Sequence, residues 1–333
     1  MKKIIIALIS VPFMLAMGYF LGPKTDYPDY IAKIEPINVP LDALDDYLAS
    51  REDTVTNLKP GNEARLVWSD SIKQTDWAIV YLHGFSASTR EGHPVHETLA
   101  SRFGMNLYLA RIAGHGIESD DAFAALTPAD MINSAKEAIA IGQLIGKKVI
   151  VMSCSTGGTY SIYLAAHNPD MVDAQVLYSP NIALYDSNAK LLGGRWGLEL
   201  GQVILGDHRI VEENIGNEKQ KWATYRYRTE GLVALQTLID ETMLPEYFQK
   251  VTMPIFMGYY YKNEEEQDKV VSVAAMRAFA KNVQTSSDDF RQVAFPESGN
   301  HVICSDLHSS DYQGVIDETS LFFEEVLGIN VIK

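Results

Sequence analysis

The sequence predicts an α/β protein with a mostly parallel sheet covered by helices on both faces. Short apolar runs typical of strands alternate with longer segments of helical apolar spacing along most of the chain. A parallel sheet of this kind is buried on both faces, which agrees with the apolar character of the runs. Of the 333 residues, 47% are hydrophobic, which is normal for a globular protein with a sizeable core.

The first 22 residues have the pattern of an export signal. Lys2 and Lys3 are followed by residues 4–22, none of which is charged. This stretch is longer than the apolar core of a usual signal peptide and just long enough to span a bilayer. A small-x-small cleavage site at residues 16–18 favours a signal peptide, whereas the apolar residues 19–21 favour a membrane anchor, and both remain open. In either case we expect an exported, periplasmic or otherwise extracytoplasmic protein, either secreted or associated with the membrane through residues 4–22.

Residues 23–62 are predicted to form an extended lead-in with one short helix. Five prolines recur between residues 23 and 60, which disfavours regular structure there. After Pro40, the residues Leu41, Leu44 and Leu48 have the spacing of one apolar helix face. The main domain is therefore expected over residues 63–333.

Four helices are predicted outside the lead-in and the cap, and the longest has the clearest signals. It spans residues 127–145, with Thr127 as its N-cap and Pro128 in its first position. The other helices are predicted around Leu99 and Phe103, over residues 159–166 and over residues 311–327.

Seven strands are predicted between these helices. They span residues 64–68, 76–82, 106–111, 148–152, 174–178, 254–259 and 291–295. Between about residues 185 and 250 the alternation stops, and this stretch contains an apolar helical segment at 232–239. We therefore expect a helical cap, inserted over the strand ends, at about residues 185–250.

Ser155 is the candidate nucleophile. It lies in the small-residue turn Ser153-x-Ser155-x-Gly157, between the strand at 148–152 and the helix at 159–166. A sharp turn from strand to helix lifts one side chain clear of the sheet, and the next backbone N–H then faces negative charge on a substrate. The alternative is a turn that closes an ordinary strand–helix unit and has no chemical role.

The chain carries a set of short motifs that resembles the α/β-hydrolase superfamily. The layout is most similar to its carboxylesterase and monoacylglycerol-lipase branch, which is related to the serine aminopeptidases, and the resemblance covers about residues 64–327. Ser153 stands where the family's G-x-S-x-G pattern has its first glycine. The motifs, each at a strand end, are His83-Gly84-Phe85, Gly114-His115-Gly116, Ser153-x-Ser155-x-Gly157, an acidic residue after the strand at 254–259, and Gly299-Asn300-His301.

The resemblance implies an α/β-hydrolase fold and a catalytic triad of Ser155, Asp268 and His301. A serine hydroxyl needs a base, and the family carries its histidine after the last strand, where His301 lies and His308 is the rival. The acid orients that histidine and is expected at Asp268, just before Val270 and Val271. The neighbouring acidic residues Glu264, Glu265 and Glu266 are expected to form a solvated loop.

Two backbone amides are implied as the oxyanion hole, those of Phe85 and Thr156. His115, in contrast, is implied to be structural. Together these residues predict a serine hydrolase that cleaves a small-molecule carboxylic ester, of short or medium acyl length or monoacylglycerol-like, through an acyl-enzyme on Ser155.

Two other functions remain open. One is an amide or peptide hydrolase of the serine aminopeptidase type, which needs a cap carboxylate aimed at a substrate amine. The other is a non-catalytic binding protein of the same fold. The cap carboxylates available to an aminopeptidase are Glu199, Glu212, Glu213, Glu230 and Asp240.

Composition argues against several other classes of protein. The net charge of −15 would repel a phosphate backbone, so no nucleic-acid partner is expected. No cofactor is expected, because Gly157-Gly158 lacks the Lys-Ser or Lys-Thr pair of a phosphate loop. His93 and His96 have the helix spacing of two metal ligands, but we expect them at the surface and predict no metal site.

The two cysteines, Cys154 and Cys304, do not make this a disulfide scaffold. Each lies near a candidate catalytic residue, so the fold could bring them together. Two buried free thiols and one disulfide are both compatible with the sequence.

Overall fold

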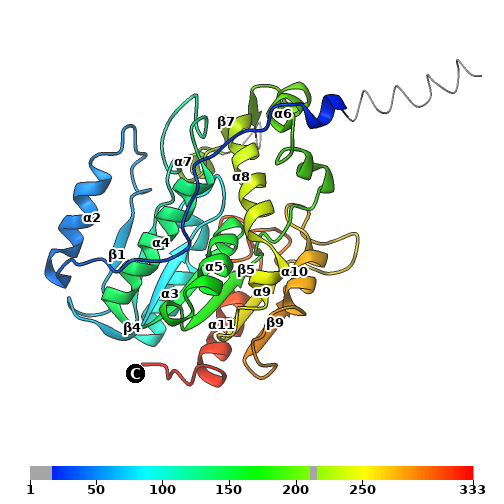
Figure 1. Ribbon diagram of the computed structural model, residues 1–333. Helices are drawn as coiled ribbons and strands as arrows, with labels where there is room; N and C mark the ends of the chain where they lie inside the picture. Colours follow the sequence, from blue (N-terminus) through cyan, green and yellow to red (C-terminus); the bar gives the residue numbers. More distant parts are fainter. Residues whose placement is uncertain (1–16, 211–215, 333) are drawn as a thin grey trace, which may run out of the picture.

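The computed structural model describes residues 17–210 and 216–332, and its centre is a seven-stranded sheet with the order β1-β3-β2-β4-β5-β8-β9 (Figure 1). Neighbouring strands are parallel except β1, which runs antiparallel to β3. The predicted α/β fold with a mostly parallel sheet is confirmed. The strands are β1 (Arg65–Val67), β2 (Thr75–Leu82), β3 (Asn106–Ala110), β4 (Gly146–Cys154), β5 (Ala174–Tyr178), β8 (Ile255–Tyr259) and β9 (Phe290–Ala294).

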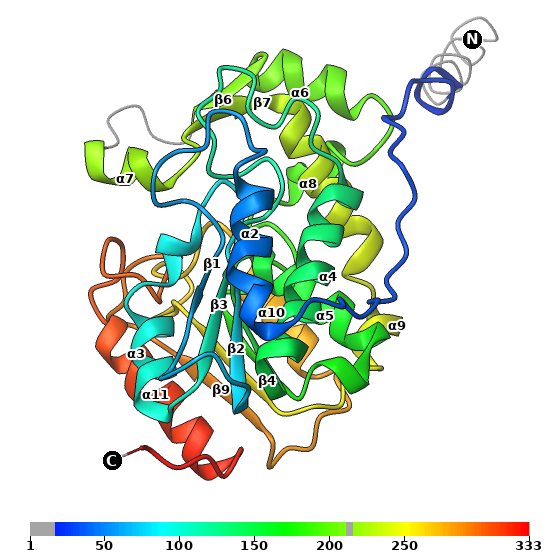
Figure 2. The ribbon, with the colours of Figure 1, turned by 90° about the vertical axis from the view of Figure 1, so that its left-hand side faces the viewer.

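Helices cover both faces of the sheet (Figure 2). Alternate residues of β2 point to opposite faces: Ile79 and Tyr81 belong to one apolar core cluster, and Val80 and Leu82 to the other. The cluster of Tyr81 is covered by α3 (Val95–Phe103) and α11 (Tyr312–Glu325). The cluster of Val80 is covered by α4 (Pro128–Ile145), α5 (Thr156–His167), α9 (Pro245–Phe248) and α10 (Val273–Ala280).

Helix α4 begins as the sequence predicts. The side chain of Thr127 accepts a hydrogen bond from the backbone N–H of Asp130 at 3.1 Å, and the carboxylate of Asp130 accepts one from the N–H of Thr127 at 3.1 Å. Pro128 occupies the first helical position, where no N–H is needed. Such an N-cap stabilises a helix by about 0.5–2 kcal/mol.

The lead-in is extended up to Pro40 and then forms η1 (Leu41–Ala43) and α2 (Leu44–Glu52). Leu44 and Leu48 are buried in the core, so the predicted apolar face of this helix packs on the domain. The extended part is held by Asn168 at the end of α5, whose side chain bonds both the N–H of Ile34 and the carbonyl oxygen of Ala32 at 2.9 Å.

The segment between β5 and β8 forms a cap over the carboxyl ends of the strands (Figure 1). The sequence predicted its helical character. It did not predict the two-stranded antiparallel sheet of β6 and β7 within the cap, because each strand has only three residues. Besides α9, the cap contains η4 (Ser187–Leu191), α6 (Gly197–Leu205), β6 (His208–Ile210), α7 (Asn217–Trp222), β7 (Arg226–Arg228) and α8 (Thr229–Thr242). The remaining short helices of the domain are η2 (Thr89–Gly92) and η3 (Pro169–Met171).

Most of the predicted export segment, residues 1–16, lies outside the described residues. The part that follows contacts the cap: the N–H of Trp196 donates to the carbonyl oxygen of Pro23 at 2.7 Å, and Arg195 donates to that of Gly22 at 2.8 Å. Across residues 17–210 and 216–332, no helix has both the length and the apolar character needed to cross a membrane.

Candidate active site

Ser155 lies in a sharp turn between β4 and α5. Its backbone has φ 52° and ψ −121°, a combination that residues other than glycine rarely adopt. Its N–H donates to the carbonyl oxygen of Tyr178, and its own carbonyl oxygen accepts from the N–H groups of Gly158 and Asn181, each at 2.9 Å. The turn therefore holds the serine side chain at the N-terminus of α5.

Small residues on both sides of Ser155 let the turn pack closely. A Cβ atom on Gly157 would lie 2.0 Å from the carbonyl oxygen of Leu82, so only glycine fits between α5 and the end of β2. Ser153 is fully buried, and its hydroxyl donates to the carbonyl oxygen of Val176 on β5 at 3.3 Å. That acceptor explains how a serine is tolerated where the family pattern has a glycine.

His301 and Asp268 form a buried pair. His301 Nδ1 lies 2.6 Å from Asp268 Oδ2. The second carboxylate oxygen, Oδ1, accepts hydrogen bonds from the backbone N–H groups of Val270 and Val271 at 2.8 and 3.0 Å. Because Nδ1 donates to Asp268, Nε2 of the neutral imidazole is the nitrogen that can accept a proton.

The pair also sets the charge of both groups. Burial works against the Asp268 carboxylate, but His301 and the two backbone N–H groups outweigh it and lower the pKa of Asp268. Burial also works against a charged His301, but Asp268 and then Glu91 outweigh it and raise the pKa of His301 above its ordinary value of 6.5. An ionised Asp268 therefore stabilises the imidazolium that forms when His301 accepts a proton.

Ser155, Asp268 and His301 line a single cavity of about 740 Å³. The structure thus brings the three predicted triad residues together from separate strand ends. His308, the rival base, lines the same cavity, but the carboxylate of Asp268 is bonded to His301. The cap contributes apolar side chains to the lining of the cavity, among them Trp222, Tyr227, Leu232 and Leu235.

Phe85 and Thr156, the predicted oxyanion donors, also line this cavity. Phe85 follows the end of β2, and Thr156 is the first residue of α5. Neither backbone N–H donates a hydrogen bond to an acceptor among the described residues. Both amides are therefore available to a ligand beside Ser155.

His83 fixes the turn that carries Phe85. Its Nδ1 donates to the carbonyl oxygen of Gly84 at 2.9 Å, and its Nε2 accepts from the N–H of Ile112 at 3.1 Å. Burial lowers the pKa of His83 to about 4, so the ring stays neutral as these bonds require. His115 packs against it with ring centroids 5.1 Å apart, which agrees with a structural role for His115.

Glu91 is a site residue that the sequence did not reveal. It comes from η2, lines the cavity, and accepts hydrogen bonds through Oε2 from the N–H of Gly84 at 2.8 Å and the hydroxyl of Tyr81 at 3.2 Å. Burial raises the pKa of Glu91, and the Gly84 amide and His301 partly offset this. Its carboxylate therefore holds the His83–Gly84 peptide group, one residue before the N–H of Phe85.

The loop after β5 links the serine to the histidine, and this was also missed. The hydroxyl of Ser179 donates to the carbonyl oxygen of His301 at 2.7 Å. Two residues on, Asn181 bonds Ser155 through its backbone and Thr156 Oγ1 through its side-chain amide, the latter at 3.3 Å. The Ser-x-Asn spacing is too common to have signalled this role.

The two cysteines are buried free thiols, which decides between the alternatives that the sequence left open. Cys304 Sγ donates to the carbonyl oxygen of Glu91 at 3.5 Å and lies 3.9 Å from the hydroxyl of Tyr81. Burial, and then the neighbouring Cys304, raise the pKa of Cys154 well above its ordinary value. Cys154 therefore stays protonated and is a poor nucleophile despite its place beside Ser155.

The prediction that His93 and His96 lie at the surface is wrong for His96. This residue is fully buried because η2 folds back over it, and its Nε2 bonds the carbonyl oxygen of Thr89 at 2.9 Å. His93 Nδ1 instead lies 2.7 Å from Glu97. Among the residues that the structure describes, no group of three or more His, Cys, Asp or Glu side chains is arranged to hold a metal ion.

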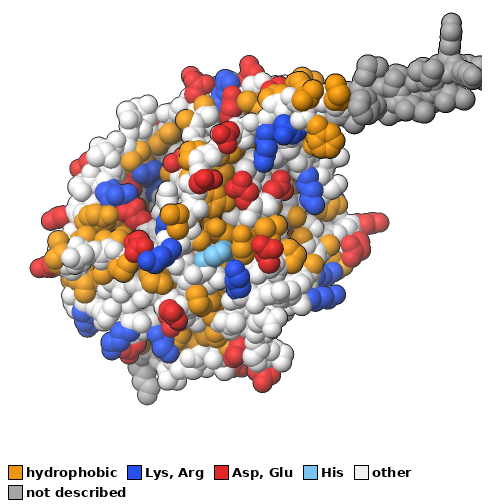
Figure 3. Space-filling model, in the orientation of Figure 1, with side chains coloured by type: hydrophobic (Ala, Val, Ile, Leu, Met, Phe, Trp, Pro, Cys, Tyr) orange, Lys and Arg blue, Asp and Glu red, His pale blue; other side chains and the backbone are white. Residues whose placement is uncertain are grey.

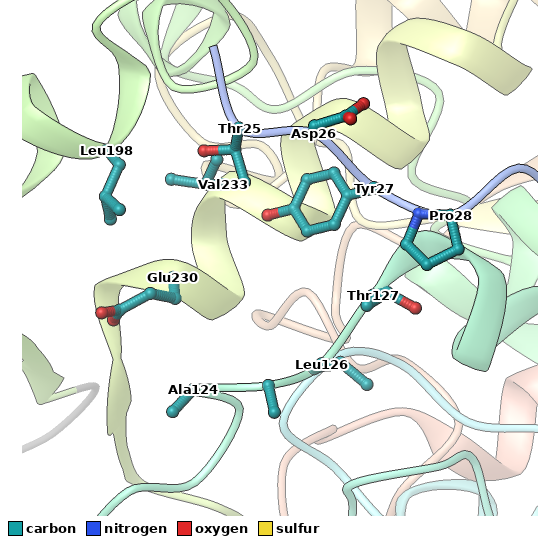
Figure 4. Close-up of a pocket in the computed structure, with 11 residues that line it drawn as sticks. Thr25, Asp26, Tyr27, Pro28, Ala124, Leu126, Thr127, Leu198, Glu230 and Val233 are labelled. Atoms are coloured by element: carbon teal, nitrogen blue, oxygen red, sulfur yellow. The ribbon is translucent and has the colours of Figure 1, made fainter. Parts of the chain in front are cut away.

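A smaller pocket lies between the lead-in and the cap. Its volume is about 200 Å³, and Figure 4 shows Thr25 and Tyr27 of the lead-in near Val233 of α8, with Glu230 of the same helix farther to the left. Burial, and then Glu230, raise the pKa of Tyr27 to about 12. None of the predicted triad or oxyanion-hole residues lines this pocket, whereas the candidate cap carboxylate Glu230 does.

Comparisons with known proteins identify the family of this chain. Residues 79–318 match the alpha/beta hydrolase family. A thermostable monoacylglycerol lipase from Bacillus sp. (strain H-257) is 30% identical over 93 residues, which make up 28% of this chain and 36% of the lipase. The chain thus spans about a third of the length of that curated relative.

Solved structures share the fold at low sequence identity. A structure from the metagenome-derived lipolytic enzymes LipS and LipT has a TM-score of 0.64 at 14% identity, over 80% of this chain and 99% of that one. A soluble variant of the monoglyceride lipase from Saccharomyces cerevisiae has a TM-score of 0.58 at 12% identity, over 78% of this chain and 91% of that one. The sheet order, the strand ends that carry the site and the family match over residues 79–318 lead to one conclusion: the chain belongs to the alpha/beta hydrolase family.

Proposed function

We propose that this protein is a serine hydrolase that cleaves carboxylic esters through an acyl-enzyme on Ser155. The observation that carries the proposal is the 2.6 Å contact between His301 and Asp268 in the same cavity as the strained Ser155. A histidine with one nitrogen bonded to a carboxylate and the other open is the base that a serine hydroxyl requires.

In the first half of the reaction, His301 Nε2 takes the proton of the Ser155 hydroxyl while Oγ attacks the ester carbonyl carbon. The N–H groups of Phe85 and Thr156 donate to the oxygen that becomes negative. Losing one such donor typically lowers the rate about a hundred- to a thousandfold. The imidazolium then gives its proton to the alcohol oxygen, the C–O bond breaks, and the acyl group stays on Ser155.

In the second half, water replaces the alcohol. His301 takes a proton from the water, whose oxygen attacks the acyl carbon, and then returns that proton to Ser155 as the carboxylic acid leaves. The apolar cap residues Leu232 and Leu235 provide the wall against which a short or medium acyl chain, or the chain of a monoacylglycerol, would lie.

An ester substrate is favoured over an amide with a free amine because of where the cap carboxylates lie. Glu230 pairs with Arg228 at 2.8 Å and faces the smaller pocket of Figure 4, and Asp240 accepts from Gln236 at 2.8 Å. Glu199 does not line the active-site cavity, and Glu212 and Glu213 lie outside the described residues. No described cap carboxylate therefore faces Ser155.

The test combines active-site labelling with hydrolysis. Wild-type protein should react with a fluorophosphonate probe and hydrolyse aryl esters faster than aminoacyl anilides, with acyl preference profiled up to monoacylglycerols. Ser155→Ala should lose both labelling and hydrolysis. Ser153→Ala is the matched control, because its hydroxyl is turned toward Val176, and it should still be labelled. Labelling of Ser155→Ala would refute the mechanism, and an unlabelled wild type would favour a non-catalytic binding protein.

Export through residues 1–22 is part of the same proposal. Tyr19, Phe20 and Leu21 are all exposed, Leu21 to 76%, and Figure 3 shows hydrophobic side chains gathered beside the grey N-terminal segment. Such a patch suits either a protein anchored in the membrane by its N-terminal segment or one whose signal peptide is cleaved on the N-terminal side of the patch. Mass analysis of the protein from membrane and soluble extracytoplasmic fractions separates the two, and an intact N-terminus in the cytoplasm alone would refute export.

A further inference from the structure

We propose that this site prefers esters that carry an anionic group in addition to the scissile ester. The inference rests on the proposed function and names its substrate class. Four cationic side chains line the active-site cavity, and they come from four different parts of the chain: Arg90 from η2, Arg209 from β6, Lys219 from α7 and Lys269 from the loop after β8. The positive charge of the lining therefore comes from four separate elements rather than from one.

The two carboxylates that line the cavity already have partners within the protein. Asp268 is bonded to His301 and to two backbone amides. Glu91 is bonded to the Gly84 amide and the Tyr81 hydroxyl. Neither carboxylate forms an ion pair with one of the four cations.

Most of the cations, in contrast, have no protein carboxylate to bind. Arg90 pairs with Asp306 at 2.6 Å. Arg209, Lys219 and Lys269 form no ion pair with any described residue. Within the described part of the chain, their charges are therefore not neutralised by an ion pair, and all three side chains line the cavity.

This local excess of positive charge runs against the composition of the chain, which has 43 acidic and 28 basic residues. The net field of the molecule repels anions, so an anionic ligand would need local cations at its binding site. Neutral esters would gain nothing from such an arrangement.

The rest of the lining is apolar and suits an acyl chain. Its members include Leu184, Trp222, Leu232, Leu235 and Val270. At about 740 Å³, the cavity falls within the size range of sites for ligands much larger than a short ester. An amphiphilic ester with one anionic group matches both parts of the lining.

The anion could belong to the acyl side, as in a dicarboxylate half-ester, or to the alcohol side, as in a monoacylglycerol phosphate. Two matched substrate pairs separate these sources. The first compares the 4-nitrophenyl esters of glutarate and pentanoate, and the second compares 1-lauroylglycerol 3-phosphate with 1-lauroylglycerol. The pair that shows the preference identifies the side that carries the anion.

We expect a kcat/KM at least several-fold higher for the anionic member of one pair, mainly through a lower KM, and a loss of this preference as salt is added. Lys219→Gln and Lys269→Gln should each reduce the preference by about two- to fivefold, the range of single exposed charge interactions. Lys262→Gln is the control: Lys262 pairs with Glu266 at 3.6 Å, does not line the cavity, and should leave the preference unchanged.

Equal kcat/KM values within both pairs, a preference for the neutral members, or a preference that survives Lys219→Gln and Lys269→Gln would overturn the inference. These outcomes differ from a failure of the proposed function. If neutral esters are hydrolysed through Ser155 without an anionic preference, only the substrate class is wrong, whereas hydrolysis that persists in Ser155→Ala removes the basis of both.

Discussion

Ser155 keeps its unusual backbone conformation because its neighbours impose it. A residue other than glycine in such a region costs of order 1–3 kcal/mol, and here hydrogen bonds to Tyr178, Gly158 and Asn181 hold both sides of the peptide in place. The strain comes from the Cβ atom rather than from the hydroxyl. Alanine and glycine at this position should therefore differ in stability although both lack the nucleophile.

We expect Ser155→Gly to unfold at a higher temperature than Ser155→Ala. Removing the Cβ relieves the backbone strain, and the added flexibility of glycine in the unfolded chain offsets part of the gain, which leaves roughly 1 kcal/mol in favour of glycine. Calorimetry of the two variants measures the difference. Equal melting temperatures would mean that the turn is not strained.

Glu91 provides a second test at the level of single residues, because it both accepts a hydrogen bond from the Gly84 N–H and places a negative charge near His301. Asp268, and after it Glu91, raise the pKa of His301 above 6.5 against the effect of burial. Because only neutral His301 can act as the base, kcat/KM of the wild type should begin to fall, as the pH is lowered, at a pH above 6.5; this fall is the acid limb of the pH profile. Glu91→Gln keeps an acceptor for the Gly84 N–H but removes the charge, so the limb should move to lower pH. Glu91→Ala also removes the acceptor and should lower kcat about tenfold or more, because the turn before Phe85 is no longer held.

The readout is the pH dependence of kcat/KM for a neutral aryl ester. A purely structural role for Glu91 would lower stability or kcat without moving the limb. An unchanged limb in a correctly folded Glu91→Gln variant would therefore rule out its electrostatic effect on His301.

These residues also show what sequence could and could not reveal. Ser155 and His301 lie directly after predicted strands, where chain order alone places them at one edge of a parallel sheet. Glu91 contacts Gly84 only because η2 turns the chain back on itself. The same turn buries His96, which its helix spacing alone could not indicate.

At the scale of elements, the contact between α5 and the end of β2 positions the site. It brings the N–H of Thr156 and the turn of Phe85 to the same side of Ser155. Gly157 makes the contact possible, since a Cβ there would lie 2.0 Å from the backbone oxygen of Leu82.

We expect Gly157→Ala to destabilise the protein by about 3 kcal/mol, the upper end of the range for overpacking, because a backbone atom cannot move aside as a flexible side chain can. Esterase activity should fall in the fraction that folds, since α5 must shift away from Phe85. Gly216→Ala is the matched control, because no atom of the described residues lies within 4 Å of a Cβ at Gly216. Thermal unfolding and kcat of both variants check this. Equal melting temperatures and equal kcat values for the two variants would show that α5 can accommodate a Cβ at residue 157 without moving.

The strands and helices with strong local sequence signals were the ones predicted most accurately. β5 has the predicted bounds, and α4 starts at its predicted cap, because apolar runs and capping residues are local signals. β6 and β7 were missed because two strands of three residues are too short to carry such a pattern. Their pairing depends on the fold of the cap.

At the scale of the whole molecule, the lead-in joins parts that are distant in sequence. It contacts the cap at Trp196, reaches Glu241 at the end of α8 through the hydroxyl of Tyr30 at 3.0 Å, and bonds Asn168 at the end of α5. Only the last of these contacts is buried, and it lies next to Ile34, which is 4% exposed. The contribution of the lead-in to stability should therefore be concentrated after residue 30.

Two truncations test this distribution. Among the described residues, removing residues 1–22 breaks the part-buried hydrogen bond from Arg195 to Gly22 and the exposed one from Trp196 to Gly18, and should change the free energy of unfolding by no more than about 1 kcal/mol. Removing residues 1–40 exposes the pocket of Ile34 and leaves the buried side chain of Asn168 without two partners, which together should cost about 3 kcal/mol or more. Denaturant unfolding of the two variants measures both values. If the longer truncation were as stable as the shorter one, the lead-in would be a passive tether; if it is less stable as expected, residues 23–40 contribute to the stability of the folded domain.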